Sequence, residues 1–202
     1  MNWLDPPFNL IVSGITNCGK THFVLDLLET VFRKKFDYIV IFCPTFQVNK
    51  TYERPFIKKN PNVIVLAPKA VSDDLESVLT ICVEAYSGKN TLFLIDDCAN
   101  QKSIKKKASE LTNLAFSGRH HGISVWFITQ KYNAVVKDFR DNIRHLVLFY
   151  EKDEDSLKAA LTENAIIPKD KRQSTIEELK RGRKSKLLLR LEAPYDYCIE
   201  HN

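Results

Sequence analysis

Short apolar runs alternate along the chain with longer stretches in which apolar residues recur every three or four positions. The short runs are typical of strands buried on both faces, and the longer spacing is typical of helices that bury one face. The predicted strands span 8–12, 36–43, 63–66, 91–96, 123–130, 145–150 and 186–191. The predicted helices span 23–32, 72–86, 104–116, 153–163 and 174–181.

This alternation of strands and helices predicts the fold class. It favours an α/β protein with a mainly parallel sheet and helices on both faces, because parallel neighbours need a long crossover. The polar, basic segment 45–61 is predicted to be a connection with little regular structure. The 202 residues fit one domain, with a core over about 8–150 and a basic C-terminal extension over about 165–202. No apolar run approaches the ~20 residues of a membrane span, so we expect no integral membrane segment.

The first strand and the first helix are joined by the turn Gly14-Ile15-Thr16-Asn17-Cys18-Gly19-Lys20-Thr21. The motif G-x-x-x-x-G-K-T in this context predicts a phosphate-binding loop, because backbone N–H groups and the positive end of the helix face the oxyanion. Lys20 can reach the β- and γ-phosphates, and the Thr21 hydroxyl can ligate Mg²⁺. We predict a site for ATP or GTP with Mg²⁺, and a glycine-rich turn without a ligand is the alternative. The predicted nucleotide contacts are Gly14, Ile15, Thr16, Asn17, Cys18, Gly19, Lys20, Thr21 and His22.

Polar side chains end two other apolar strands. Asp96 and Asp97 end one of them, and Gln130 ends the other. The carboxyl ends of parallel strands share one edge of a sheet, so we expect these side chains beside the glycine-rich turn. Asp96 is then a candidate Mg²⁺ ligand, Asp97 a carboxylate that orients or deprotonates the attacking water, and Gln130 a sensor of the γ-phosphate. The alternatives are acids that only begin and cap a loop, and a loop amide.

The positive charge of the chain is concentrated in one segment. The net charge is +5, and the segment 169–190 holds nine basic and three acidic residues, so the remaining chain is nearly neutral. Such a segment can neutralise nucleic-acid phosphates, and a solvated basic face is the alternative. The basic run Lys105, Lys106 and Lys107 is a further candidate DNA contact.

The cysteines and histidines do not predict a metal site. Five cysteines show no C-x-x-C and no paired metal spacing, which is typical of buried thiols in a reducing, intracellular setting. His22, His120 and His121 have no acid or cysteine at ligand spacing, so we expect exposed histidines.

One stretch carries a family resemblance. Gly118-Arg119-His120-His121-Gly122-Ile123 continues to Thr129-Gln130, and it resembles the G-R-x-x-G-I-x-hydrophobic-T-Q stretch of FtsK/HerA-type DNA-pumping ATPases. The phosphate loop near the N-terminus and the strand Phe36-Asp37-Tyr38-Ile39-Val40-Ile41-Phe42-Cys43-Pro44-Thr45 make the chain similar to the poxvirus-type genome-packaging ATPases of large DNA viruses and related mobile elements. The resemblance covers about residues 8–150.

The resemblance implies a RecA-like P-loop NTPase core and a homo-oligomeric ring, a pentamer or a hexamer. It implies ATP hydrolysis at subunit interfaces, coupled to movement of double-stranded DNA, with packaging of a viral genome into a capsid. A capsid or portal-vertex protein is then a partner. The implied location is a viral assembly site in the host cytoplasm or nucleus, or the virion itself.

The resemblance also implies roles for single residues. It matches Asp96 to the Mg²⁺ ligand, Gln130 to the polar sensor and Asp97 to the catalytic carboxylate. Many relatives carry Glu at that last position, so the shorter Asp97 is expected to act through a positioned water. Arg119 matches an arginine that we expect to serve a neighbour's nucleotide as an arginine finger. A contact within one subunit is its alternative, and Arg140 and Arg144 compete for the role.

Two other functions stay open from the sequence. A small-molecule or nucleoside kinase also uses a phosphate loop, and residues 169–190 would then form its basic lid. A nucleotide-binding regulatory module with little turnover is the second.

Overall fold

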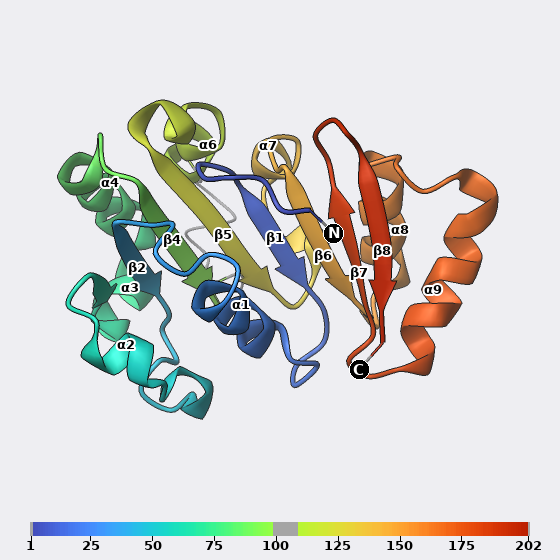
Figure 1. The fold of residues 1–202 in the computed structure, drawn as a ribbon, viewed down its shortest axis with the longest axis horizontal. Coiled ribbons are helices and arrows are strands. Elements are labelled where there is room, and N and C mark those ends of the chain that lie inside the picture. Colours follow the sequence, from blue (N-terminus) through green and yellow to red (C-terminus); the bar gives the residue numbers. More distant parts are fainter. Residues whose placement is uncertain (1, 99–108, 202) are drawn as a thin grey trace.

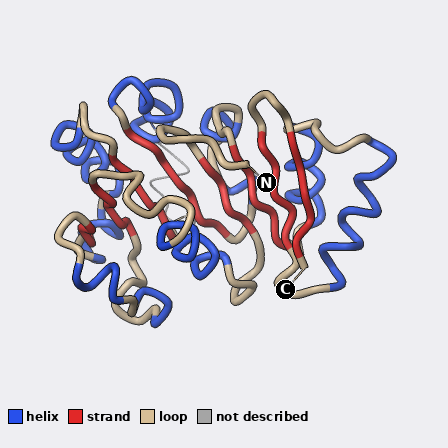
Figure 2. The backbone as a smooth tube through the Cα atoms, in the orientation of Figure 1, coloured by secondary structure: helices blue, strands red, loops and turns tan. Residues whose placement is uncertain are grey.

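The structure, a computed structural model, describes residues 2–98 and 109–201. One eight-stranded sheet crosses the molecule, with helices on both sides of it (Figures 1 and 2). Its strand order is β3-β2-β4-β5-β1-β6-β7-β8. The strands are β1 (Leu10–Ser13), β2 (Tyr38–Phe42), β3 (Val63–Val65), β4 (Thr91–Asp96), β5 (Ile123–Thr129), β6 (His145–Phe149), β7 (Lys186–Arg190) and β8 (Asp196–Glu200).

The first six strands are parallel, and β7 and β8 are antiparallel to their neighbours. The expected α/β class with a mainly parallel sheet is therefore confirmed. Because β6 and β7 run in opposite directions, the start of β7 lies beside the end of β6, where Lys186 pairs with Phe149. The turn before β7 thus lies at the same edge of the sheet as the ends of the parallel strands.

The helices form two layers. They are α1 (Lys20–Glu29), α2 (Pro55–Lys59), α3 (Pro68–Asp73), α4 (Leu75–Tyr86), α6 (Ser109–Ser117), α7 (Lys137–Arg140), α8 (Glu154–Glu163) and α9 (Arg172–Arg181). The apolar residues of α1 and α2 pack on one face of the sheet, and those of the other helices pack on the opposite face. Along β1, for example, Leu10 and Val12 face the α1 layer and Ile11 faces the other, as the two-residue period of a strand requires.

Burial explains why the short apolar runs became strands. Every residue of β1, β4, β5 and β6 is buried, so these strands need apolar side chains on both faces. The described residues also form the short 3₁₀ helices η1 (Lys50–Tyr52), η2 (Gly118–His121), η3 (Tyr132–Ala134) and η4 (Lys169–Lys171).

The structure differs from the sequence-based expectation in several segments. The predicted helix 72–86 is divided at Asp74 into α3 and α4. The segment 45–61 contains η1 and α2. The strand β8 was not predicted, because it lies at the edge of the sheet with exposed or half-buried residues and lacks the continuous apolar pattern of the inner strands. The predicted helix 104–116 is described from Ser109 onward, so Lys105, Lys106 and Lys107 lie outside the described residues. Among residues 2–98 and 109–201, no helix combines the length and the apolar character needed to cross a bilayer.

Candidate nucleotide-binding site

Three neighbouring strands end together at the carboxyl edge of the sheet. In the order β4-β5-β1, Asp96 is in register with Ile128, and Thr129 is in register with Ser13. The next residue after each of these strand ends is Asp97, Gln130 or Gly14. The strand register therefore brings the three predicted motifs to one place.

A cleft of about 800 Å³ opens at this edge. The cleft-lining residues that the sequence predicted are Thr16, Asn17, Gly19, Lys20, Thr21, His22, Asp96, Asp97 and Gln130. Gly14, Ile15 and Cys18 belong to the loop beneath them, and Cys18 is almost fully buried. Its burial raises the pKa of the Cys18 thiol, so the side chain is a neutral packing group of the loop.

The loop backbone explains its two glycines. Gly14 has φ 153° and Gly19 has φ 101°, both in the region that favours glycine. A Cβ on Gly14 would clash with Phe149 at the end of β6, whereas a Cβ on Gly19 would meet no atom within 4 Å. Gly19 is also the residue before α1, so its conformation turns the chain into that helix.

Lys20 is the first residue of α1, and its ammonium lies inside the loop. Its Nζ donates to the carbonyl oxygens of Gly14 at 2.7 Å and Ile15 at 2.9 Å. The side chain is largely buried and still lines the cleft. The structure thus places one fixed positive charge at the centre of the loop.

Asp96 is the carboxylate opposite the loop. Its Oδ2 accepts a hydrogen bond from Thr21 Oγ1 at 2.9 Å and another from the Tyr52 hydroxyl at 2.7 Å. Burial raises the pKa of the Asp96 carboxyl, while these two hydrogen bonds oppose the rise. A carboxylate and a hydroxyl side by side are oxygen donors of the kind that Mg²⁺ prefers, so Asp96 and Thr21 fit a divalent cation.

Asp97 and Gln130 are exposed on the wall of the cleft. Asp97 has φ 58°, a left-handed conformation that Asp adopts more readily than most residues. Thr45, at the start of the segment after β2, donates to its Oδ2 at 3.3 Å. Both polar groups therefore have access to a ligand in the cleft.

The segment after Gln130 is fastened to the junction between β6 and α8. Three consecutive residues make the contacts: Lys131 Nζ with Asp153 Oδ2 at 2.9 Å, Tyr132 N with Glu151 Oε1 at 3.1 Å, and Asn133 N with Ser156 Oγ at 3.2 Å. The position of Gln130 is therefore set by β5 on one side and by this junction on the other.

Glu151 is a site-supporting residue that the sequence reasoning missed. It is fully buried two residues after the end of β6, and burial raises the pKa of its carboxyl. The signal was available, because an acid follows the apolar run 145–150 as Asp96 ends the run 91–96. Tyr52 and Thr45 were also missed, since they lie in a segment without a clear pattern.

The three candidate arginines lie at different places. Arg119 is exposed in η2, at the amino end of β5, whereas Gln130 lies just beyond its carboxyl end. Arg119 is thus at the edge of the sheet opposite the cleft. Arg140 lines the cleft, pairs with Glu163 at 3.1 Å and has its guanidinium 5.0 Å from the centre of the Tyr132 ring. Arg144 pairs with Glu192 at 2.8 Å before β6.

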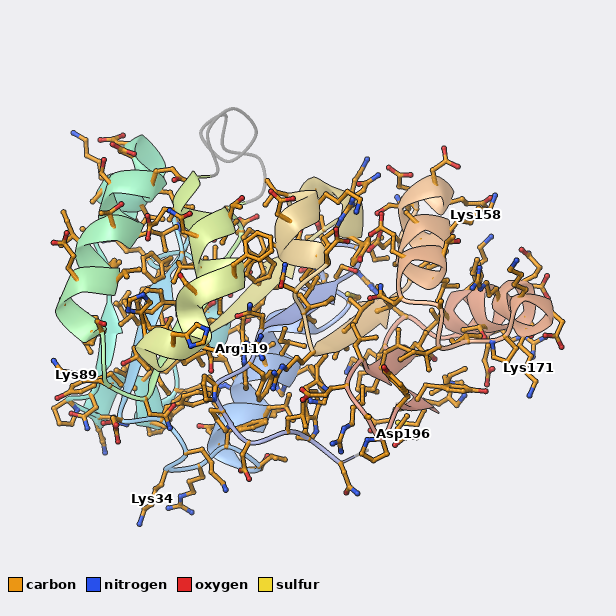
Figure 3. All side chains as sticks on the ribbon, turned by 90° about the horizontal axis from the view of Figure 1, so that it is seen from above. Lys34, Lys89, Arg119, Lys158, Lys171 and Asp196 are labelled. Carbon is orange, nitrogen blue, oxygen red and sulfur yellow. The ribbon has the colours of Figure 1, made fainter. Side chains whose placement is uncertain are left out.

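The basic segment 169–190 ends in β7, which belongs to the same sheet. Lys186 is buried, pairs with Glu200 at 3.0 Å and lies over the Phe23 ring of α1. Exposed basic side chains of this segment are Lys169, Lys171, Lys180, Arg181, Arg183 and Lys184. Lys158 and Lys171 lie at one end of the molecule and Lys89 at the other (Figure 3). Burial raises the pKa of the Cys18 thiol, and the charge of Arg183, in the turn before β7, is the smallest of the effects that oppose this rise.

Two solved structures with this fold were determined with ATP analogues. The genome-packaging NTPase B204 of Sulfolobus turreted icosahedral virus 2, solved in complex with ATP-gammaS, superposes with a TM-score of 0.69 over 98% of both chains, at 15% identity. The conjugation coupling protein TcpA of pCW3, solved with ATPgS, superposes with a TM-score of 0.60 over 94% of this chain and 59% of that chain, at 13% identity. At these identities the superpositions show the fold alone.

Sequence comparisons give the family. DNA packaging protein OPG160 of Variola virus is 26% identical over 155 residues, which are 73% of this chain and 55% of that protein. The Monkeypox virus protein of the same name is also 26% identical, over 73% of this chain and 49% of its own length. The chain thus spans about half the length of these relatives. The family model described as "Poxvirus A32 protein" matches residues 2–189, and the chain therefore belongs to the poxvirus A32 protein family.

Proposed function

We propose that the protein is an ATP-driven motor that moves double-stranded DNA and packages a viral genome into a capsid. One observation carries the proposal: the phosphate loop, Asp96, Asp97 and Gln130 meet around a single cleft. The family membership and the names of the relatives, which are DNA packaging proteins, support the choice of DNA as the substrate.

The loop side of the cleft would hold the triphosphate. The backbone N–H groups of the loop and the Lys20 ammonium bind its phosphates, and Thr21 and Asp96 hold the Mg²⁺. When bound, Mg²⁺ neutralises charge on the phosphate oxygens. The contacts of the Lys20 ammonium with the carbonyls of Gly14 and Ile15 hold it within the loop. To reach a phosphate, Lys20 would exchange these contacts for contacts with the phosphate.

The opposite wall would act on water. Asp97 is exposed, with Thr45 hydrogen-bonded to its Oδ2, and it would accept a proton directly or through a second water, as its short side chain favours. Gln130 donates and accepts hydrogen bonds, so it can contact the γ-phosphate and the attacking water together. The segment after Gln130 is hydrogen-bonded to Glu151 and Ser156, so a shift of Gln130 after hydrolysis would be transmitted to β6 and α8.

Assembly would complete the site. Arg119 lies at the opposite edge from its own cleft, so its proposed role as an arginine finger requires a neighbouring subunit in a homo-oligomeric ring of five or six copies. Arg140 lines the subunit's own cleft and is the candidate for a contact in cis. A capsid or portal-vertex protein is the proposed docking partner, and the proposed place of action is a viral assembly site in the infected cell.

The proposed DNA contacts are electrostatic. The exposed lysines and arginines of residues 169–184 would neutralise phosphates without reading bases. The run Lys105–Lys107 is proposed for the same role. Within this set Lys180 is paired with Glu154, and the buried Lys186 is paired with Glu200.

Steady-state ATPase activity, with and without double-stranded DNA over a range of protein concentrations, tests the function. We expect specific activity to rise with concentration as the ring assembles, and to rise further with DNA. Asp97→Asn serves as the control, since it should abolish turnover while ATP still binds. Phosphate transfer to a nucleoside without DNA stimulation would instead indicate a kinase, and cellular function retained by Asp97→Asn would indicate a regulatory module.

A further inference from the structure

The contacts of Tyr52 extend the site beyond the residues that the motifs mark. Tyr52 is the last residue of η1, and its hydroxyl donates to Asp96 Oδ2 at 2.7 Å. Thr21 Oγ1 donates to the same oxygen at 2.9 Å. One carboxylate oxygen therefore receives hydroxyl groups from two segments that are far apart in the sequence.

The Tyr52 side chain is held in place by its surroundings. It is 1% exposed, and its ring centre lies 4.9 Å from that of Phe46. The turn beneath it is closed by the Asn49 side chain, which accepts a hydrogen bond from the Thr51 N–H at 3.1 Å. A buried ring in a capped turn has little freedom, so the position of its hydroxyl is fixed.

The segment that carries Tyr52 is fastened to the helix that follows the phosphate loop. Arg54 Nη1 contacts Asp26 Oδ1 at 2.7 Å and Glu29 Oε2 at 2.6 Å, both on α1. The Arg54 side chain is 14% exposed, and its partners are more exposed, Asp26 at 50% and Glu29 at 33%, so solvent screens the Glu29 pair less than the Asp26 pair. Because α1 begins with Lys20 and Thr21, the ion pairs of Arg54 fix the position of Tyr52 relative to the phosphate loop.

We propose that Tyr52 is a positioning residue for the divalent cation and that it acts through Asp96. Its hydroxyl holds the carboxylate in one orientation before the cation arrives, so the cation does not have to order it. The inference rests on the proposed function, in which Asp96 and Thr21 hold Mg²⁺. It adds a residue from the segment 45–61 that contacts neither the nucleotide nor the metal itself.

Tyr52→Phe tests the proposal, because it keeps the buried ring and removes the hydroxyl. Binding of Mn²⁺, followed by electron paramagnetic resonance in the presence of a non-hydrolysable ATP analogue, measures the cation directly. We expect the Mn²⁺ dissociation constant to rise about tenfold or more, as is typical when a hydrogen-bond partner of a metal ligand is lost. The Mg²⁺ concentration for half-maximal ATPase should rise in parallel, while kcat at saturating Mg²⁺ stays within about twofold.

Tyr132→Phe is the matched control. Tyr132 is equally buried, and its hydroxyl bonds Glu163 at 2.9 Å and Asn164 at 3.1 Å, away from Asp96. This control should lose stability without a change in Mn²⁺ affinity. Phe46→Leu, which loosens the Tyr52 ring and keeps its hydroxyl, should raise the Mn²⁺ dissociation constant by less than Tyr52→Phe, and it serves if Tyr52→Phe does not fold.

Asp96→Asn separates the two ways in which the proposal can fail. If Asp96→Asn abolishes Mn²⁺ binding and Tyr52→Phe binds Mn²⁺ like the unsubstituted protein, the role of Tyr52 is overturned and the proposed function stands. An equal effect of Tyr52→Phe and Tyr132→Phe on Mn²⁺ binding also overturns the role. If Asp96→Asn leaves Mn²⁺ binding intact, the proposed metal site is itself wrong.

Discussion

Gly14 lies where the phosphate loop leaves β1 and passes against Phe149 at the end of β6. Gly19 lies at the start of α1 with open space around its missing side chain. The sequence motif treats these two positions alike, but the structure gives them different requirements. Gly14 is needed for both backbone conformation and close packing, whereas Gly19 is needed for backbone conformation.

At this scale we predict that Gly14→Ala destabilises the fold strongly. The added Cβ must displace Phe149, and the φ of 153° is strained for alanine, so we expect a loss of about 2–4 kcal/mol in the free energy of unfolding. Gly88→Ala is the control, because Gly88 has φ 80° and open space, and it should lose only about 1 kcal/mol. Urea unfolding of both variants gives the comparison, and equal losses would contradict the packing requirement.

The junction between β6 and α8 is the element that joins the sensor strand to the rest of the sheet. Glu151, at its start, accepts the Tyr132 N–H two residues after Gln130. Its carboxyl is fully buried, and burial raises its pKa above the usual value of 4.5. The native state therefore holds the Glu151 proton more tightly than the unfolded chain does.

At this scale we predict that the difference in stability between Glu151→Gln and the unsubstituted protein depends on pH. Between pH 4.5 and the raised native pKa, the Glu151 contribution to stability falls as the pH rises, because the unfolded state loses its proton first. Glutamine does not titrate and its oxygen can still accept the Tyr132 N–H. We expect Glu151→Gln to gain stability relative to the unsubstituted protein as the pH rises through this window, with urea unfolding as the measurement. A difference that stays constant with pH would contradict it, and Glu151→Ala should be less stable throughout by about 1–3 kcal/mol.

Local patterns predicted most of the elements and the centre of the site. Strands such as β4 and β5 are apolar at nearly every position, and the loop 14–21 lies between a strand and a helix, so each could be recognised from its own residues. Tyr52 and Arg54 could not, because their partners Asp96, Asp26 and Glu29 are distant in sequence. The strand β8 forms only by pairing with β7, so its own residues gave a weak signal.

At the scale of the whole molecule, basic side chains lie at both edges of the sheet. The cleft and the turn with Arg183 lie at the carboxyl edge, and Arg119 lies at the amino edge. A finger at the amino edge can act only on another subunit, so the arrangement itself connects the proposed role of Arg119 to assembly.

Mixing two inactive variants tests that connection. In a mixed ring, an Arg119→Ala subunit supplies an intact cleft and an Asp97→Asn subunit supplies an intact Arg119, so we expect ATPase activity to reappear. Each variant alone should lose activity, and loss of an arginine finger costs about 10³–10⁵ in turnover. The mixture of Arg140→Ala with Asp97→Asn should stay inactive if Arg140 acts on its own cleft. No recovery with Arg119→Ala would contradict its proposed action between subunits.

The reversed direction of β7 has a consequence for the C-terminal part of the chain. A parallel seventh strand would begin at the far edge, but the antiparallel one starts beside Phe149, so the turn with Arg183 and Lys184 lies at the same edge of the sheet as the cleft. Cutting the chain after Pro168 would therefore remove β7, β8 and α9, together with the basic side chains that lie at this edge. The basic segment, which we propose as a DNA contact, therefore approaches the sheet at the same edge as the cleft.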